Sequence, residues 1–299
     1  MRRRSLLQLL PGAFTLLVVG LHSTGLAVPP PAPPPMPLSR SDRLRFLALA
    51  DTGSGDANQR AVGQQMAALH RRAPVDLVLL GGDNIYPSGD LALIEATFRR
   101  PYAELLAAGV PFHAVLGNHD IRTANGAHQI AYAPFGMKGR YYNLQRGPVE
   151  FFMLDTNVNA DWAAQLSWLR GVLARSTAPW KVVVGHHPIY SSGLYGNNPA
   201  LRARLTPIMH QYGVQLYING HEHNYERSVL IDGITYLVVG GGGVGLRPVL
   251  PTAQSAKALS VHSFVEIQAG ADALQLTAWD RNGRKIDQAT ILPRPAGSR

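Results

Sequence analysis

The stretch Leu77–Tyr86, LVLLGGDNIY, is a run of apolar residues that stops at two glycines and a carboxylate. Such a run indicates a buried strand in a sheet that is covered on both faces. The glycines let the backbone turn sharply, so Asp83 is expected at the carboxyl end of the strand, where α/β sheets bind ligands. With Asn84 and Tyr86 it offers oxygen donors that suit a hard cation. By itself, an aspartate after a strand is more commonly a helix cap or a turn former.

The same pattern recurs at four other predicted strand ends. Strands are predicted over about 43–50, 112–116, 180–184 and 214–218, and a glycine stands beside the polar residues that follow each of them. Those polar residues are Asp51, Asn118 with His119, His186, and His221 with His223. Five strand ends of this kind favour a cluster of metal ligands, since one layered domain brings separate strand ends together. In an extended segment, the His-x-His spacing also points both rings to one side.

The order of the predicted elements indicates the fold class. Helical patterns over about 57–72, 91–108, 161–174 and 199–212 alternate with the strands, and the last third of the chain is mostly strands. This order predicts an α/β (α+β-like) fold, a four-layer αββα sandwich of two mixed β-sheets flanked by helices. No internal repeat or interior linker composition is visible, so residues 41–293 are predicted to form one domain.

The N-terminal segment has the pattern of an export signal. Residues 1–27 hold three arginines, an apolar run and then small residues, and the segment 28–40 is a proline-rich linker. Arg3 and Arg4 also resemble the pair of a twin-arginine signal, with an ordinary basic signal as the alternative. A membrane anchor is not expected, because Pro11 interrupts a run that is already short. The protein is therefore expected to be periplasmic or secreted.

Charge and cysteine content limit the possible partners. Without the three leading arginines, 25 of the 28 basic residues stand against 19 acidic ones, a net charge of about +6. The charge is spread out, so nucleic acid is not expected as a partner, whereas small anionic substrates are favoured by electrostatic steering. The chain has no cysteine, which excludes disulfides, thiolate metal sites and a cysteine nucleophile.

The ordered motifs ADTG, GGDNIY, GNHD, VVGH and GHEH resemble those of the calcineurin-like metallophosphoesterases. The tyrosine of GGDNIY and the segment GHEHNYERS are similar to the purple acid phosphatase branch, in its small single-domain form. The resemblance covers about residues 45–291 and implies a dinuclear-metal phosphomonoesterase that acts on small phosphorylated substrates, with metal-held water or hydroxide attacking phosphorus directly. The alternatives are a phosphodiesterase of the same superfamily and a metal-binding surface protein without catalysis.

The resemblance also implies the metal ligands. The first metal would be held by Asp51, Asp83, Tyr86 and His223. The second would be held by Asp83, Asn118, His186 and His221. Asp83 would bridge the two ions. Phenolate is a hard, strongly donating ligand, so Fe(III) is expected at the Tyr86 site and a divalent Fe, Zn or Mn ion at the other.

Two residues that follow Asn118 are candidates for the catalytic machinery. His119 comes directly after a ligand, so its ring is expected near the leaving-group oxygen, where it can donate a proton. The alternative for His119 is a structural role. Asp120 either orients His119 or caps the loop.

The candidate substrate contacts are His187, which follows a predicted ligand, and Tyr195. The purple acid phosphatase branch usually has a further histidine in the loop after the fourth motif, and the segment SSGLYGNNP, 191–199, has none. Tyr190 or Tyr195 is expected to fill that space. Gly240–Gly243 lack the Lys-Ser/Thr pair of a phosphate-binding P-loop, so close backbone approach beside the site is the preferred interpretation.

Overall fold

In the computed structural model, the described residues are 43–293. The predicted signal peptide, 1–27, and the linker, 28–40, lie outside them, as do residues 294–299. Within the described part of the chain, the helices are all too short or too polar to cross a lipid bilayer.

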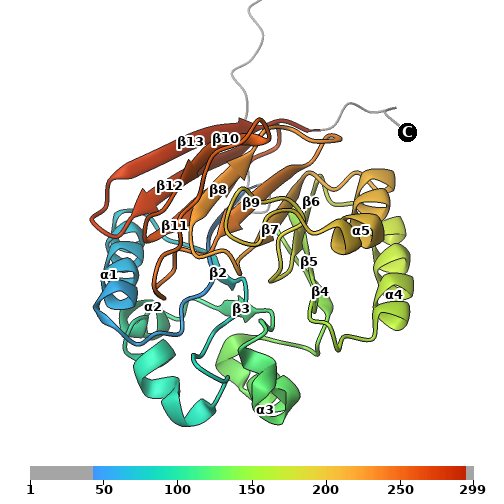
Figure 1. Ribbon diagram of the computed structural model, residues 1–299. Helices are drawn as coiled ribbons and strands as arrows, with labels where there is room; N and C mark the ends of the chain where they lie inside the picture. The colour runs from blue at the N-terminus through green and yellow to red at the C-terminus, as the bar shows by residue number, and fades with distance from the viewer. Residues whose placement is uncertain (1–42, 294–299) are drawn as a thin grey trace, which may run out of the picture. The chain divides into compact units, whose positions relative to one another are not determined.

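The first β-sheet has six strands in the order β13-β12-β11-β1-β2-β3 (Figure 1). Three neighbouring strands, β1, β2 and β3, run parallel. On the other side of β1, β11 pairs antiparallel with β1, β12 with β11, and β13 with β12. The strands are β1 Leu44–Leu49, β2 Leu77–Leu80, β3 Phe112–Ala114, β11 Ser263–Ala269, β12 Leu274–Asp280 and β13 Lys285–Ile291.

The second β-sheet has seven strands in the order β10-β8-β9-β7-β6-β5-β4. Its centre is parallel, from β5 through β6 and β7 to β9, while β4, β8 and β10 pair antiparallel. The strands are β4 Tyr142–Arg146, β5 Val149–Met153, β6 Trp180–Val184, β7 Leu216–Asn219, β8 Tyr225–Ser228, β9 Thr235–Val239 and β10 Ser255–Leu259. Both sheets are therefore mixed, as predicted.

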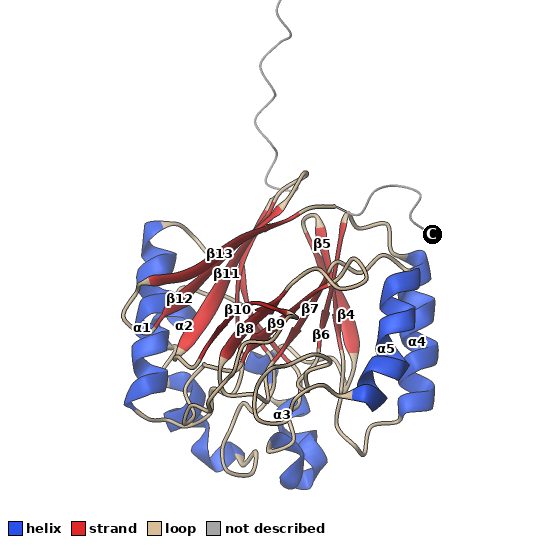
Figure 2. Ribbon diagram, turned by 45° about the horizontal axis from the view of Figure 1, so that its top comes forward, coloured by secondary structure: helices blue, strands red, loops and turns tan. Residues whose placement is uncertain are grey.

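Helices cover the outer face of each sheet, as Figure 2 shows. Apolar side chains of α1 and of the segment before α2 pack on the first sheet, and those of α4 and α5 pack on the second. The helices are α1 Ala57–Arg72, α2 Ala103–Ala107, α3 Ala127–Ala131, α4 Trp162–Arg175 and α5 Pro199–Gln211. The predicted four-layer αββα sandwich is confirmed.

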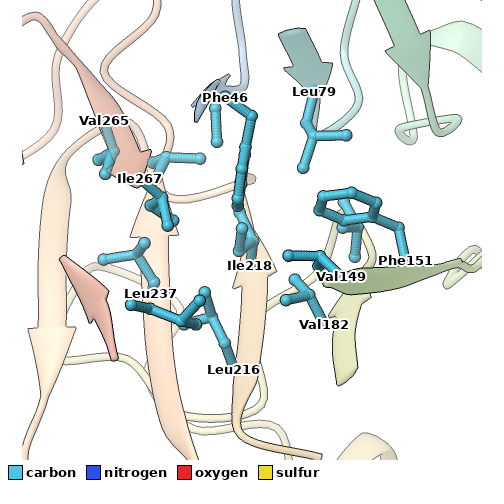
Figure 3. Packing of buried hydrophobic residues seen from close by; sticks show 14 of the residues in the cluster. Phe46, Leu79, Val149, Phe151, Val182, Leu216, Ile218, Leu237, Val265 and Ile267 are labelled. Carbon is cyan, nitrogen blue, oxygen red and sulfur yellow. The ribbon is translucent and has the colours of Figure 1, made fainter. Parts of the chain in front are cut away.

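The core lies between the two sheets and consists of the inward-facing side chains of both (Figure 3). The rings of Phe46 on β1 and Phe151 on β5 meet edge to face across this space, with centroids 5.1 Å apart at 87°. Such pairs add to the gain from apolar burial. Packing between the sheets holds β1, β2, β6 and β7 in position relative to one another. It therefore also positions the carboxyl ends of these strands, where the candidate site lies.

The helical segment over 91–108 is interrupted, as expected from Pro101, which cannot donate a backbone hydrogen bond. It consists of a 3-10 turn, a π-helix at Glu95–Arg99 and the short α2. The edge strand β10 was not predicted. Its side chains are half-buried or exposed, so it lacks the apolar alternation by which a strand is recognised.

Candidate metal centre

The candidate site lies at the carboxyl ends of strands from both sheets. Asp51, Asp83 and His221 stand just after β1, β2 and β7, with φ angles of 54°, 52° and 69°. This left-handed region is unfavourable for residues other than glycine and persists only where surrounding structure enforces it. The backbone is thus held in an unfavourable conformation at three of the seven predicted ligands.

The first group of donor atoms surrounds the phenol of Tyr86. Its Oη lies 3.0 Å from Asp51 Oδ1, 2.8 Å from Asp83 Oδ2 and 3.3 Å from His223 Nε2. His223 Nε2 is also 3.5 Å from Asp51 Oδ1. The four side chains predicted for one metal therefore meet at a single point.

The second group surrounds the amide oxygen of Asn118. Asn118 Oδ1 lies 3.1 Å from His186 Nε2 and 2.9 Å from His221 Nδ1. His186 Nε2 is 3.4 Å from Asp83 Oδ2, the same oxygen that contacts Tyr86 in the first group. The structure thus brings all seven predicted ligands together in two groups that share one carboxylate oxygen.

The hydrogen bonds of Nδ1 in two of the histidine rings show that the donor set fits metal ions. His186 Nδ1 lies 2.9 Å from Gly81 O, and His223 Nδ1 lies 2.8 Å from Gly245 O. An N–H donated to a backbone carbonyl leaves the lone pair of Nε2 facing the donor groups, which is the usual arrangement of a metal-ligating histidine. The ligand atoms of Asp51, Asp83 and His186 all lie within 4.8 Å of one another. Hard oxygens with imidazole nitrogens suit iron, zinc or manganese.

Burial of the acidic side chains in the site means that positive charge beside them would stabilise their ionised forms. The Asp51 carboxyl is fully buried, and burial raises its pKa to about 7 although His186 acts in the opposite direction. Burial also acts to raise the pKa of Asp83, but contacts with His186 and His119 outweigh it and hold that pKa below its usual range. For Tyr86, burial and the two carboxylates raise the pKa well above its ordinary value. A bound cation would reverse this effect on the phenol.

His119 lies at the edge of the first group. Its backbone N–H donates to Asp83 Oδ1 at 2.8 Å, and its ring lies 4.3 Å from the ring of Tyr86. Nδ1 is 2.7 Å from Pro87 O, so it carries the hydrogen, and Nε2 is 4.0 Å from Asp83 Oδ2 and 3.3 Å from the Arg122 guanidinium. The ring is one-fifth exposed, so Nε2 can reach a ligand bound over the site.

Asp120 anchors two site loops and does not contact the His119 ring. Its buried carboxylate accepts hydrogen bonds from the backbone N–H groups of Asn84 at 3.0 Å, Ile85 at 3.2 Å and Gly117 at 2.8 Å. The Gln129 amide donates to it as well, at 2.9 Å. These bonds tie the loop after β2 to the loop after β3. Of the two predicted roles, the contacts favour holding the loops.

The predicted substrate contacts lie beside the second group. His187 Nδ1 is 2.9 Å from Thr156 Oγ1, its ring lies 4.6 Å from that of His221, and burial lowers its pKa to about 3. Tyr195 stacks on His221, with centroids 4.7 Å apart at 23°. Tyr190 instead packs against Tyr236 on β9. Tyr195 is therefore the residue that fills the space beside His221.

Two further residues were not predicted. The Glu222 carboxylate, in the middle of GHEH, accepts the backbone N–H of Leu194 at 3.1 Å and that of Tyr195, so it holds the loop before α5. Arg247 donates from its guanidinium to His221 O at 2.8 Å and lies 5.0 Å from the Tyr195 ring centroid. Glu222 could have been found from its motif, whereas Arg247 belongs to none.

Comparison with known proteins gives consistent matches. The model of the calcineurin-like phosphoesterase family matches residues 44–225. Purple acid phosphatase 3 of Arabidopsis thaliana is 29% identical over 69% of this chain, which spans 65% of the plant protein's length. Tartrate-resistant acid phosphatase type 5 of Rattus norvegicus is 27% identical to this chain. The match covers 84% of this chain and 91% of the rat protein. The solved structure of the purple acid phosphatase PPD1 of yellow lupin has a similar fold, with a TM-score of 0.70 and 21% sequence identity. The match covers 84% of this chain and 54% of the lupin chain.

The anchoring role of Asp120 predicts a loss of stability that does not depend on metal. In Asp120→Asn an amide group replaces one acceptor oxygen, so buried backbone N–H groups lose their partner at a cost of about 2–4 kcal/mol in the free energy of unfolding. Thermal unfolding of the chelator-treated protein should shift down by roughly 5–15 °C. The control, Asp161→Asn at the N-cap of α4, should shift little, since Asn caps as well as Asp. Unchanged stability with a changed pH–rate profile would instead assign Asp120 to orienting His119.

Proposed function

The chain belongs to the calcineurin-like phosphoesterase family, and we propose that it is an exported phosphomonoesterase of the purple acid phosphatase type that uses two metal ions. The sequence pattern of residues 1–27 supports export. The relatives named above support the reaction class. Small phosphate monoesters are the proposed substrates.

One observation carries this proposal, namely the two donor groups that share Asp83 Oδ2. A shared carboxylate oxygen is suited to holding two ions close together. A pair of bound ions would supply Lewis acidity toward the phosphoryl oxygens and would lower the pKa of water in the site. One ion would be held by Asp51, Asp83, Tyr86 and His223, and the other by Asp83, Asn118, His186 and His221.

The chain itself supplies proton transfer and positioning. His119 Nδ1 donates to Pro87 O, so Nε2 is the ring nitrogen that faces the donor groups. From there Nε2 can hold a proton for the oxygen of the departing alcohol. The backbone N–H of His119 donates to Asp83 Oδ1 and so helps to orient the Asp83 carboxylate that both groups share. Asp120 keeps the Asp83 and Asn118 loops in register with one another.

The experiment that tests this function compares an alkyl phosphate, an aryl phosphate and a phosphodiester as substrates. The wild-type protein with its metals should hydrolyse both monoesters much faster than the diester. Preference for the diester would favour the phosphodiesterase alternative, and no hydrolysis of any substrate with both metals bound would favour a non-catalytic protein.

The variant His119→Ala separates the role of His119 within the same assay. Positioned acid catalysis contributes about a hundred- to ten-thousand-fold, and a poor leaving group needs it most. The rate on the alkyl phosphate should therefore fall by this factor, the rate on the aryl phosphate far less, and the metal content should stay unchanged. Equal losses on both substrates, or loss of metal, would mean that the His119 ring acts structurally.

The phenol of Tyr86 is the basis for the proposed identity of the first metal. Its phenol oxygen contacts two carboxylates and an imidazole, and phenolate is a hard donor that suits Fe(III). We propose Fe(III) in this group and a divalent Fe, Zn or Mn ion in the Asn118 group.

This assignment predicts a coloured protein. Phenolate bound to Fe(III) absorbs visible light by charge transfer, so the purified protein should be coloured and Tyr86→Phe should be bleached. The control is Tyr195→Phe, whose ring stacks beside the site without entering the donor groups, and it should keep the colour. A colourless and fully active native protein that contains only zinc would contradict the ferric assignment and leave the reaction class intact.

A further inference from the structure

The loop after β9 is fixed to the candidate ligands at several points. Gly242 N–H donates to Ala50 O at 3.1 Å, and Val244 N–H donates to Asp51 O at 3.0 Å. Arg247 N–H donates to His223 O at 3.0 Å. The glycines make this close approach possible, as the sequence predicted, because a side chain on Gly242 would collide with the backbone of Ala50. The backbone of Arg247 is thus positioned by the same residues that form the metal centre.

The guanidinium of Arg247 lies at the mouth of the site. One of its N–H groups donates to His221 O, and its carbon atom is 5.0 Å from the Tyr195 ring centroid. Tyr195 is 56% exposed, whereas Asp51 and Asp83 are almost fully buried. The Arg247 side chain therefore lies beside the exposed outer part of the site.

Arg247 forms no ion pair within 4 Å among residues 43–293, whose arginine ion pairs involve Arg45, Arg71, Arg100, Arg140 and Arg227. The Glu222 carboxyl feels its charge from farther away, and this acts to lower the pKa of Glu222 against the effect of burial. A guanidinium has five N–H donors in a rigid fork that matches carboxylate and phosphate oxygens. Its Tyr195 and His221 O contacts hold the fork in place without pairing it directly with a carboxylate. A half-buried, oriented guanidinium without a direct ion pair, beside a candidate substrate site, is suited to binding an anion.

We propose that Arg247, held by Tyr195, is a specificity-determining residue that binds a second negative charge on the leaving group. This inference rests on the proposed phosphomonoesterase function. The favoured substrates are then phosphate monoesters whose leaving group carries a carboxylate or a further phosphate. Glu222 supports the arrangement, because it holds the backbone of the loop that carries Tyr195.

Two pairs of compounds test this proposal, and the members of each pair differ by one negative charge. Phosphonoacetate and methylphosphonate, which are not hydrolysed as phosphate esters, report binding by calorimetry to the metal-loaded protein. Phosphoglycolate and 2-hydroxyethyl phosphate report KM and kcat. The wild-type protein should bind the carboxylate-bearing member of each pair more tightly, and added salt should reduce the difference.

The variant Arg247→Gln should remove this preference. A lost charge-assisted contact is expected to weaken phosphonoacetate binding and raise the KM for phosphoglycolate by about ten- to hundred-fold. The loss should fall mainly on the carboxylate-bearing member of each pair, so the ratio between the two members should fall by the same factor, and Arg247→Lys should restore part of the preference. The matched control is Arg202→Gln, because Arg202 also lies over a tyrosine ring, 6.0 Å from the centroid of Tyr190, and should behave as wild type.

Three results would overturn the proposal. Equal weakening of both members of a pair in Arg247→Gln would show that Arg247 contacts the phosphoryl group. An unchanged preference would remove Arg247 from recognition. Loss of the preference in Arg122→Gln and not in Arg247→Gln would place the second charge on the His119 side. Failure of the wild-type protein to hydrolyse either ester would refute the proposed function, while calorimetry would still test the anion contact.

Discussion

The buried negative charge of Asp51 and Asp83 is the constraint on which the rest of the site depends. Both carboxylates contact one phenol oxygen at the ends of adjacent parallel strands, away from water. Burial of like charges this close together is unfavourable unless cations or hydrogen bonds compensate. The fold supplies compensation through the backbone N–H of His119 and His221 and through His186, and two bound metal ions would complete it.

The sandwich architecture explains how that charge is kept in place. Asp51 and Asp83 come from the first sheet, and His186 and His221 come from the second, so the two halves of the site meet only because the sheets pack face to face. The apolar core that the two sheets share, which includes the Phe46–Phe151 contact, stabilises that packing. The backbone around the site adopts positive φ angles that surrounding structure must stabilise, and near Asp83 the Asp120 hydrogen bonds contribute to this.

The sequence predicted the site best where the functional residue lies within a recognisable local pattern. The apolar run that ends in Gly-Gly-Asp predicted β2 and the position of Asp83, and the ordered motifs predicted which donors would meet. It was uninformative where roles depend on contacts between distant loops. Asp120 could be assigned two roles until its contacts with the Asn84 backbone were seen, and Arg247 lies in a loop whose only local feature is its glycines. The edge strand β10 lacked a hydrophobic period for the same kind of reason, since its partners lie on one side only.

The central claim is that Asp83 serves both metal ions, and the metal content of Asp83→Asn tests it most directly. Asn keeps the acceptor oxygen for the His119 N–H while it removes the charge at the shared position. Elemental analysis should find roughly two ions per wild-type chain, roughly one in Asn118→Ala, and well below one in Asp83→Asn. If Asp83→Asn retained as much metal as Asn118→Ala, Asp83 would serve one ion only and the shared-ligand account would be wrong.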